Sequence, residues 1–183
     1  MLDAKEYLHL AINAMARDEH HAALSYIKEV LVLEPQNANA LYLLGAEHAE
    51  LGLYDRAIEE IAQALHIDPN IEMARFQLGL LYLKAGQIDG AIQAFAHLAV
   101  QAQADSLRAY AAGLAALCKD DMAVAREKLA LGLSGDNNNP SLKKDMQELL
   151  NKLLDGEAVV NRQESPEDST SAPIFLGAYG NKT

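Results

Sequence analysis

A 34-residue period restricts the fold of this chain more than any other feature of its sequence. Pro35 and Pro69 lie 34 residues apart, and the small, apolar and aromatic residues around them recur at the same spacing. A period of this length is typical of proteins built from stacked structural repeats. The period predicts four units, at about residues 4–37, 38–71, 72–105 and 106–137.

Each unit places small residues where two helices would have to approach closely. Gly52 and Gly86 follow the first apolar segment of their units, at a point where a left-handed residue would end a helix. Pro35 and Pro69 would end the second helix of theirs. Each unit is therefore predicted to form a helical hairpin. The small residues are Ala11, Gly45, Gly79 and Gly113 on the first helices and Ala23, Ala57, Ala91 and Ala125 on the second.

This arrangement resembles the tetratricopeptide repeat (TPR) family, whose 34-residue unit carries these spaced small, aromatic and proline residues. The resemblance covers about three quarters of the chain and implies an all-α fold, a right-handed superhelical solenoid of antiparallel helical hairpins. It is most specific in the second and third units. The first unit lacks the glycine, and the fourth has Gln103 and Asn137 at the proline positions.

A further amphipathic helix follows the fourth unit, at about residues 140–155. Asn139 is placed as its N-cap, Pro140 as its first residue and Gly156 as its C-cap. Its leucines share one face, so we expect it to cap the apolar end of the stack. The repeat domain would then span residues 1–156, followed by a flexible acidic tail at 157–183 with an apolar block at 173–179.

The resemblance implies that the first helix of each unit lines a concave surface. The positions that project into this groove in the family are all apolar or aromatic here, and an aromatic row crosses three units. This predicts a peptide-binding groove. Its residues are Leu8, Ile12, Met15, Tyr42, Ala46, Ala49, Phe76, Leu80, Leu83, Tyr110, Leu114 and Leu117.

Two interpretations of these groove residues remain open. They could be ordinary core, since apolar residues at helical spacing usually are. Alternatively they form an exposed apolar trough, which on a soluble protein marks a binding surface. They cannot bind a carboxylate, so they argue against the Lys, Arg and Asn clamp of one TPR subgroup. Their character looks more like bacterial repeat chaperones, including those of type III secretion.

The tail ends in a stretch that suits an apolar groove. Because it contains Pro173, Gly177 and Gly180, we expect an extended form that could enter its own groove, a second copy or another protein. Its candidate ligand residues are Ile174, Phe175, Leu176 and Tyr179.

The remaining chemistry of the sequence is sparse. A net charge of −11 argues against nucleic acid and anionic membrane surfaces as partners. A single cysteine, Cys118, and an N-terminus without a signal peptide or membrane span favour the cytoplasm. His20 and His21 point about 100° apart on a helix, which disfavours a metal site. No catalytic, metal or cofactor site is predicted.

The leading hypothesis is therefore a non-enzymatic adaptor or chaperone-like module that holds a hydrophobic segment of a protein or peptide. The alternative is a structural, assembly or regulatory subunit whose groove is closed by its own tail or by self-association.

Overall fold

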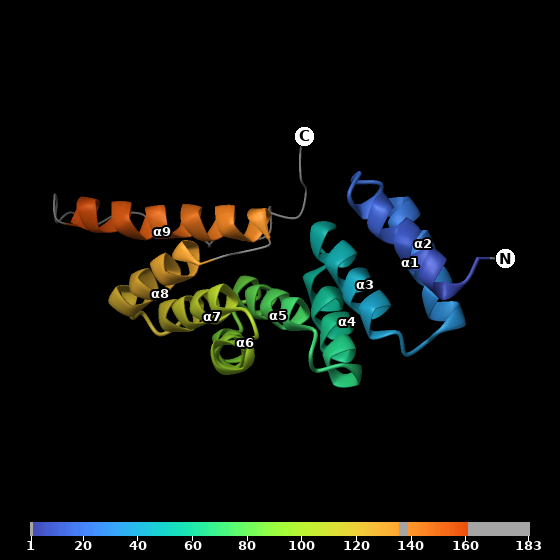
Figure 1. Ribbon diagram of the computed structural model, residues 1–183, viewed down its shortest axis with the longest axis horizontal. Helices are drawn as coiled ribbons and strands as arrows, with labels where there is room; N and C mark the ends of the chain where they lie inside the picture. The colour runs from blue at the N-terminus through green and yellow to red at the C-terminus, as the bar shows by residue number, and fades with distance from the viewer. Residues whose placement is uncertain (1, 136–138, 161–183) are drawn as a thin grey trace.

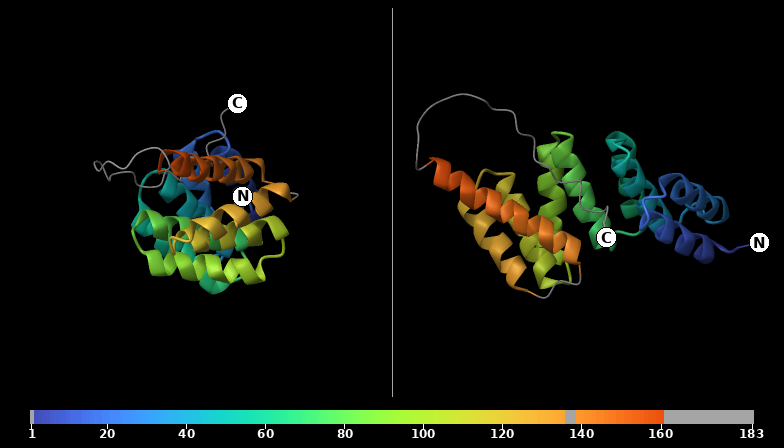
Figure 2. Two further views of the ribbon diagram at one scale, coloured as in Figure 1. Left: turned by 90° about the vertical axis from the view of Figure 1, so that its left-hand side faces the viewer. Right: turned by 90° about the horizontal axis from the view of Figure 1, so that it is seen from above.

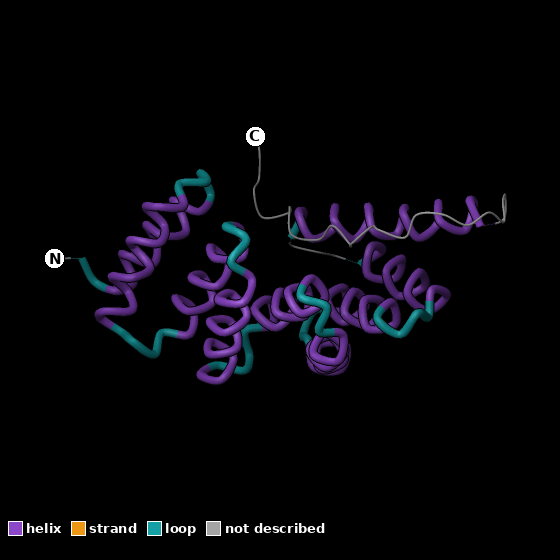
Figure 3. Tube along the Cα trace, turned by 180° about the vertical axis from the view of Figure 1, so that it is seen from behind, coloured by secondary structure: helices purple, strands orange, loops and turns teal. Residues whose placement is uncertain are grey.

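The computed structural model describes residues 2–135 and 139–160, and side chains as far as residue 155. These residues form helices joined by short turns, with no strand among them (Figure 3). In chain order the helices are α1 (Ala4–Met15), α2 (His20–Leu33), α3 (Ala38–Glu50), α4 (Tyr54–Ile67), α5 (Glu72–Lys84), α6 (Ile88–Gln101), α7 (Asp105–Leu117), α8 (Met122–Ser134) and α9 (Pro140–Val160).

Consecutive helices pair as antiparallel hairpins, and the hairpins follow one another along the long axis of the molecule (Figures 1 and 2). The fold is thus an all-α solenoid of helical hairpins, as the 34-residue period predicts. The four hairpins are α1–α2, α3–α4, α5–α6 and α7–α8. The helix α9 lies along α8 at one end, and α1 lies at the other (Figure 1).

The small residues at the helix crossings are required by the packing. A Cβ added to Gly45 would lie 2.5 Å from Cγ1 of Ile61, and one added to Gly79 would lie 2.6 Å from Cε1 of Phe95. Both neighbours belong to the second helix of the same hairpin. The predicted role of these glycines in close helix contact is confirmed.

The turn within each hairpin uses a left-handed residue at the same repeat position. Gly52 and Gly86 have φ of 77° and 72°, and Asp18 and Asp120 have φ of 58° and 59°. These four positions are spaced by 34 residues. In the outer units an aspartate therefore occupies a conformation that glycine adopts at lower cost.

Side chains at the ends of the solenoid cap their helices. The carboxylate of Asp3 accepts from the backbone N–H of Glu6 at 2.8 Å, and Glu6 accepts in turn from the N–H of Asp3 at 2.8 Å. Asn139 accepts from the N–H of Leu142 at 3.0 Å. The predicted N-cap of α9 is confirmed. However, α9 continues past Gly156 to Val160, so the prediction that Gly156 ends this helix is wrong. A glycine within a helix costs only about 1 kcal/mol, which does not by itself stop it.

The buried apolar residues fall into three clusters along the axis. The first joins α1, α2 and the start of α3, the second joins α3, α4 and α5, and the third extends from α5 to α9. The third is the largest and contains Phe76, Phe95 and Tyr110, all fully buried. The first has no buried aromatic residue and consists of Ala4, Ala11, Ile27, Val30 and Ala40. The packing is therefore much heavier at the α9 end.

Candidate peptide-binding surface

The predicted groove residues divide into a buried set and an open set. The buried set lies mostly in α5 and α7, where the first helices of the third and fourth units are enclosed on nearly all sides. Leu83 and Leu117 are partly buried against the same core. The fully enclosed residues are Ala49, Phe76, Leu80, Tyr110 and Leu114.

For these five residues the prediction of an exposed groove is wrong, and they are core. The ring of Phe76 packs edge-on against Phe95 of α6, with ring centroids 5.7 Å apart. Tyr110 packs against α8, because a Cβ added to Gly132 would lie only 2.4 Å from Cδ1 of this tyrosine. The aromatic row thus supports hairpin packing in these units. Leu142, Met146, Leu149 and Leu150 of α9 join the same core, which explains why it is closed.

The remaining predicted residues stay accessible on α1 and α3. Ile12 is 49 % exposed, and several other large apolar side chains of the described residues are exposed as well. The other residues of this set are partly exposed. We call this set the open face, and it consists of Leu8, Ile12, Met15, Tyr42 and Ala46.

Tyr42 is the aromatic residue of the open face. Its side chain packs partly against the second apolar cluster, beside α4 and α5. Burial raises the pKa of Tyr42 to about 12, so the phenol is neutral at physiological pH. The open face therefore presents apolar and uncharged groups.

The acidic residue next to the open face is less stable in its charged form than an ordinary glutamate. Glu50 ends α3, one helical turn beyond Ala46. Partial burial raises the pKa of Glu50, and the negative charges of Glu47 and Asp18 raise it further, whereas His20 and Lys84 oppose this shift. Glu50 and Asp18 place negative charge at this end of the open face.

Two histidines have partners that the sequence did not indicate. Nδ1 of His20 in α2 lies 2.9 Å from Oε2 of Glu47 in α3, and Glu47 is only 2 % exposed. Nδ1 of His48 lies 2.6 Å from Oε2 of Glu60 in α4. Each pair joins two packed helices. No local sequence signal connects residues 27 positions apart, so the first pair could be found only from the fold.

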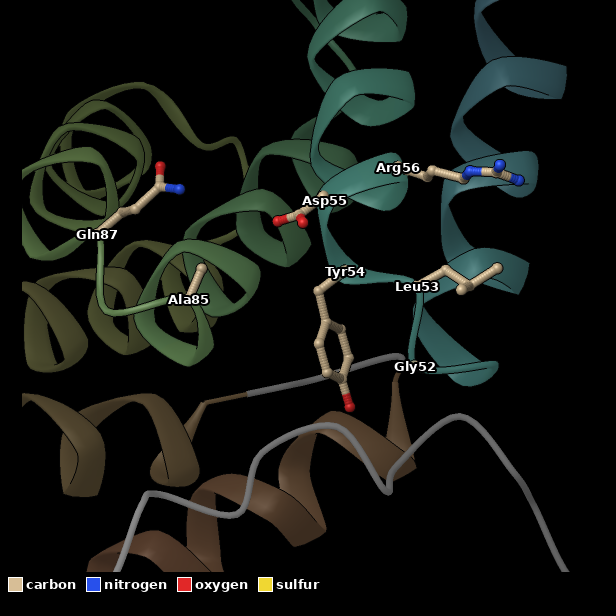
Figure 4. A pocket seen from close by; sticks show the side chains of 7 residues that line it. All are labelled: Gly52, Leu53, Tyr54, Asp55, Arg56, Ala85 and Gln87. Atoms are coloured by element: carbon tan, nitrogen blue, oxygen red, sulfur yellow. The ribbon is translucent and has the colours of Figure 1, made fainter.

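A cleft of about 530 Å³ lies between the α3–α4 turn and the α5–α6 turn (Figure 4). Asp55 projects towards Ala85 and Gln87, whereas Leu53 and Arg56 project the other way. Its lining mixes apolar and charged groups without a convergent polar set. It is the space between two hairpin turns, and we assign it no ligand.

The part of the chain that the structure describes offers little for catalysis. No group of three or more His, Cys, Asp or Glu side chains in it could hold a metal ion. Burial raises the pKa of the Cys118 thiol, which disfavours the reactive thiolate. Among the described helices, none is long and apolar enough to cross a membrane.

Comparisons with known proteins agree with this architecture. The family model described as "Anaphase-promoting complex, cyclosome, subunit 3" matches residues 16–98. The TPR domain of Sgt2 from Aspergillus fumigatus is similar with a TM-score of 0.50 and 19 % identity, over 93 % of this chain and 90 % of that chain. No curated protein matches the sequence.

Two further solved structures match with higher TM-scores. MamA (41-end) from Desulfovibrio magneticus RS-1 has a TM-score of 0.61 and 25 % identity, over 88 % of this chain and 97 % of that chain. A chain of the APC/C hetero-tetramer Cut9–Hcn1 has a TM-score of 0.71 and 20 % identity, over 87 % of this chain. This protein spans only 32 % of that chain.

The repeat period, the helical hairpins and these similarities together show that the chain has a tetratricopeptide-repeat fold. This repeat class supports protein–protein interaction, and its members typically serve as scaffolds that are not themselves enzymes.

Proposed function

We propose that this protein is a non-catalytic adaptor that binds an apolar segment of another protein on the open face of α1 and α3. The observation that carries the proposal is that apolar residues of α1 and α3 are accessible: Ile12 is exposed, and Leu8, Met15, Tyr42 and Ala46 are partly exposed. These residues come from the first helices of two successive units. Exposed apolar patches on proteins often mark binding sites.

The size of the open face suits a short segment. Full burial of one large apolar side chain contributes about 1.5–3 kcal/mol, from which the cost of ordering the segment must be subtracted. Two or three anchors would therefore give moderate affinity. This is the range expected for a client that is held and later released, which is the chaperone-like form of the proposal.

Self-binding is the second candidate function, in which the open face is covered by the protein's own tail or by a second copy. The candidate tail ligand residues Ile174, Phe175, Leu176 and Tyr179 lie outside the described residues. What favours this candidate is their apolar character alone.

The charge and cysteine content support a cytoplasmic setting with protein partners. The net charge of −11 disfavours association with nucleic acid or anionic lipid, and the single Cys118 suits a reducing compartment.

A pair of matched substitutions tests the proposed function. Ile12→Asp places a charge on the open face, and Val100→Asp places one on α6, where Val100 is also well exposed. Neither substitution buries a charge, so both proteins should fold, which circular dichroism checks. Partners captured by affinity purification of the full chain should be lost with Ile12→Asp and retained with Val100→Asp. Loss with both, or retention with both, would contradict the assignment of the open face.

A further inference from the structure

The open face has an acidic end. Glu50 lies one turn beyond Ala46 on α3, and Asp18 lies three residues after Met15 in the α1–α2 turn. Both acids are exposed. The charge of Asp18 acts repulsively on Glu50, so these two exposed carboxylates form one electrostatic group, whereas Glu47, which also acts on Glu50, is buried and contacts His20.

The two basic residues that act on Glu50, His20 and Lys84, contact other groups. Nδ1 of His20 contacts Glu47, and Nζ of Lys84 lies 4.3 Å from the ring centroid of Tyr54. Within the described residues, Glu50 and Asp18 form no ion pair. The charges of His20 and Lys84 reach Glu50 only at longer range, and they do not offset the effects of burial and repulsion on its pKa.

We propose that the open face binds a segment with apolar side chains followed by a lysine or arginine, with this cation beside Glu50 and Asp18. The inference rests on the proposed function and adds the charge and direction of the partner. The apolar part would lie over Ile12 and its neighbours. The basic group would lie at the C-terminal ends of α1 and α3, where it also complements the negative end of both helix dipoles.

Charge at this position would contribute more to selectivity than to total affinity. An exposed ion pair is worth little by itself, and one pair changes a dissociation constant by about two- to fivefold. Two acids would attract a basic partner and also repel an acidic one. At low salt we therefore expect the dissociation constants of the two partners to differ by about tenfold. The effect should shrink as ionic strength rises, because exposed charges are screened over about 10 Å at 0.1 M.

The probes are two fluorescent peptides of equal length, each long enough to form about four helical turns. They share one leucine- and alanine-rich sequence, and one ends in a lysine pair where the other ends in a glutamate pair. Fluorescence anisotropy with the full chain should give about tenfold tighter binding of the lysine peptide at low salt. In the Asp18→Asn/Glu50→Gln variant the preference should fall to about twofold.

The matched control removes two acids elsewhere. Glu29→Gln/Glu59→Gln changes the net charge equally, on exposed positions of α2 and α4. The lysine preference should survive in this variant. If both double variants reduce it equally, the preference comes from the overall charge of the protein, and the inference is wrong.

Other outcomes separate this inference from the proposed function. Equal binding of both peptides, abolished by Ile12→Asp, would overturn the charge inference and leave the proposed function standing. Binding of neither peptide would overturn the inference, while the partner-capture experiment decides the proposed function independently.

The protein's own tail is tested in the same assay. Lys182 follows Tyr179 in the sequence, so residues 173–183 share the apolar-then-basic pattern. With Phe175→Asp in the full chain, the lysine peptide should bind as it does to the unmodified protein. Markedly tighter binding would show that the tail already occupies the open face, which would overturn the assignment of a separate partner.

Discussion

Nδ1 of His20 lies 2.9 Å from Oε2 of Glu47, and this contact joins the first hairpin to the first helix of the second. The two groups differ in their surroundings, because Glu47 is almost fully enclosed and the His20 side chain is about one-third exposed. An enclosed carboxylate needs a partner, since leaving it unpaired carries a desolvation penalty. The contact therefore adds a polar link to the apolar cluster that already joins the two units.

Replacing this histidine should weaken the junction. His20→Ala leaves Glu47 without its imidazole partner, and we expect a loss of about 1–3 kcal/mol in the free energy of unfolding. His21→Ala removes an exposed neighbour and should change it by less than about 0.5 kcal/mol. Urea denaturation of both variants measures the difference. Equal effects would show that the His20 contact adds nothing to stability.

The left-handed turn positions give a second prediction. Asp120→Gly relieves a non-glycine residue at φ 59°, and we expect stabilisation of about 0.5–1 kcal/mol after the extra entropy of the unfolded glycine is subtracted. Gly52→Ala should destabilise by about 1–2 kcal/mol. Nothing lies within 4 Å of the added Cβ of Gly52, so its loss would be conformational. Denaturation midpoints of the two variants measure these changes. A shift of both midpoints in the same direction would contradict the prediction.

The close contact between α7 and α8 gives a third prediction. Gly132→Ala would drive a methyl group into the Tyr110 ring, and overpacking of this kind costs about 1–3 kcal/mol. The better helix propensity of alanine returns about 1 kcal/mol, so the net change is a loss of up to about 2 kcal/mol. Gly135→Ala is the control, because its nearest neighbour is 3.7 Å from the added Cβ. Thermal melts in which Gly135→Ala is the more damaging of the two would contradict this account of the packing.

The fourth prediction concerns pH. The pKa of Glu50 is raised in the folded state, so the folded protein binds this proton more tightly than the unfolded chain does. Its ionisation therefore lowers stability as pH rises, beginning near the ordinary glutamate pKa of about 4.3 and ending at the higher pKa of the folded state. Glu50→Gln removes this loss.

The measurement is the melting temperature of Glu50→Gln relative to the unmodified protein, from about pH 4 to about pH 7. The difference should move in favour of the variant as pH rises. Glu59→Gln, which replaces an exposed acid on α4, is the control and should show a flatter profile. A Glu50→Gln difference that is constant across this range would show that the folded protein does not disfavour the charged form.

The fold was predictable because its determinants are local and repeated. Gly45 and Gly79 mark helix crossings, and Pro35 and Pro69 mark helix ends, so the period carries the hairpin geometry directly. Asp18 and Asp120 occupy the same left-handed turn as Gly52 and Gly86, but an aspartate gives no comparable sequence signal.

The burial of the candidate binding residues was predictable only in part. The periodic pattern showed which residues share a helix face, and Ile12 on one of these faces is exposed. It could not show that Phe76 packs on Phe95, or that Tyr110 lies against Gly132, because these contacts depend on how far the two helices of a hairpin are rotated. Long-range polar pairs such as His20 with Glu47 leave no periodic trace.

The uneven distribution of the apolar clusters has a consequence for how binding would be detected. The cluster of α1, α2 and α3 lacks buried aromatic residues, so this end of the solenoid should open first, and its amides should exchange fastest with deuterium. The open face is built on the same helices. Occupancy would therefore be coupled to local unfolding, and a ligand at about 100 times its dissociation constant would stabilise that end by about 2.7 kcal/mol. Slower exchange confined to α1–α3 would report a bound partner without any change in shape.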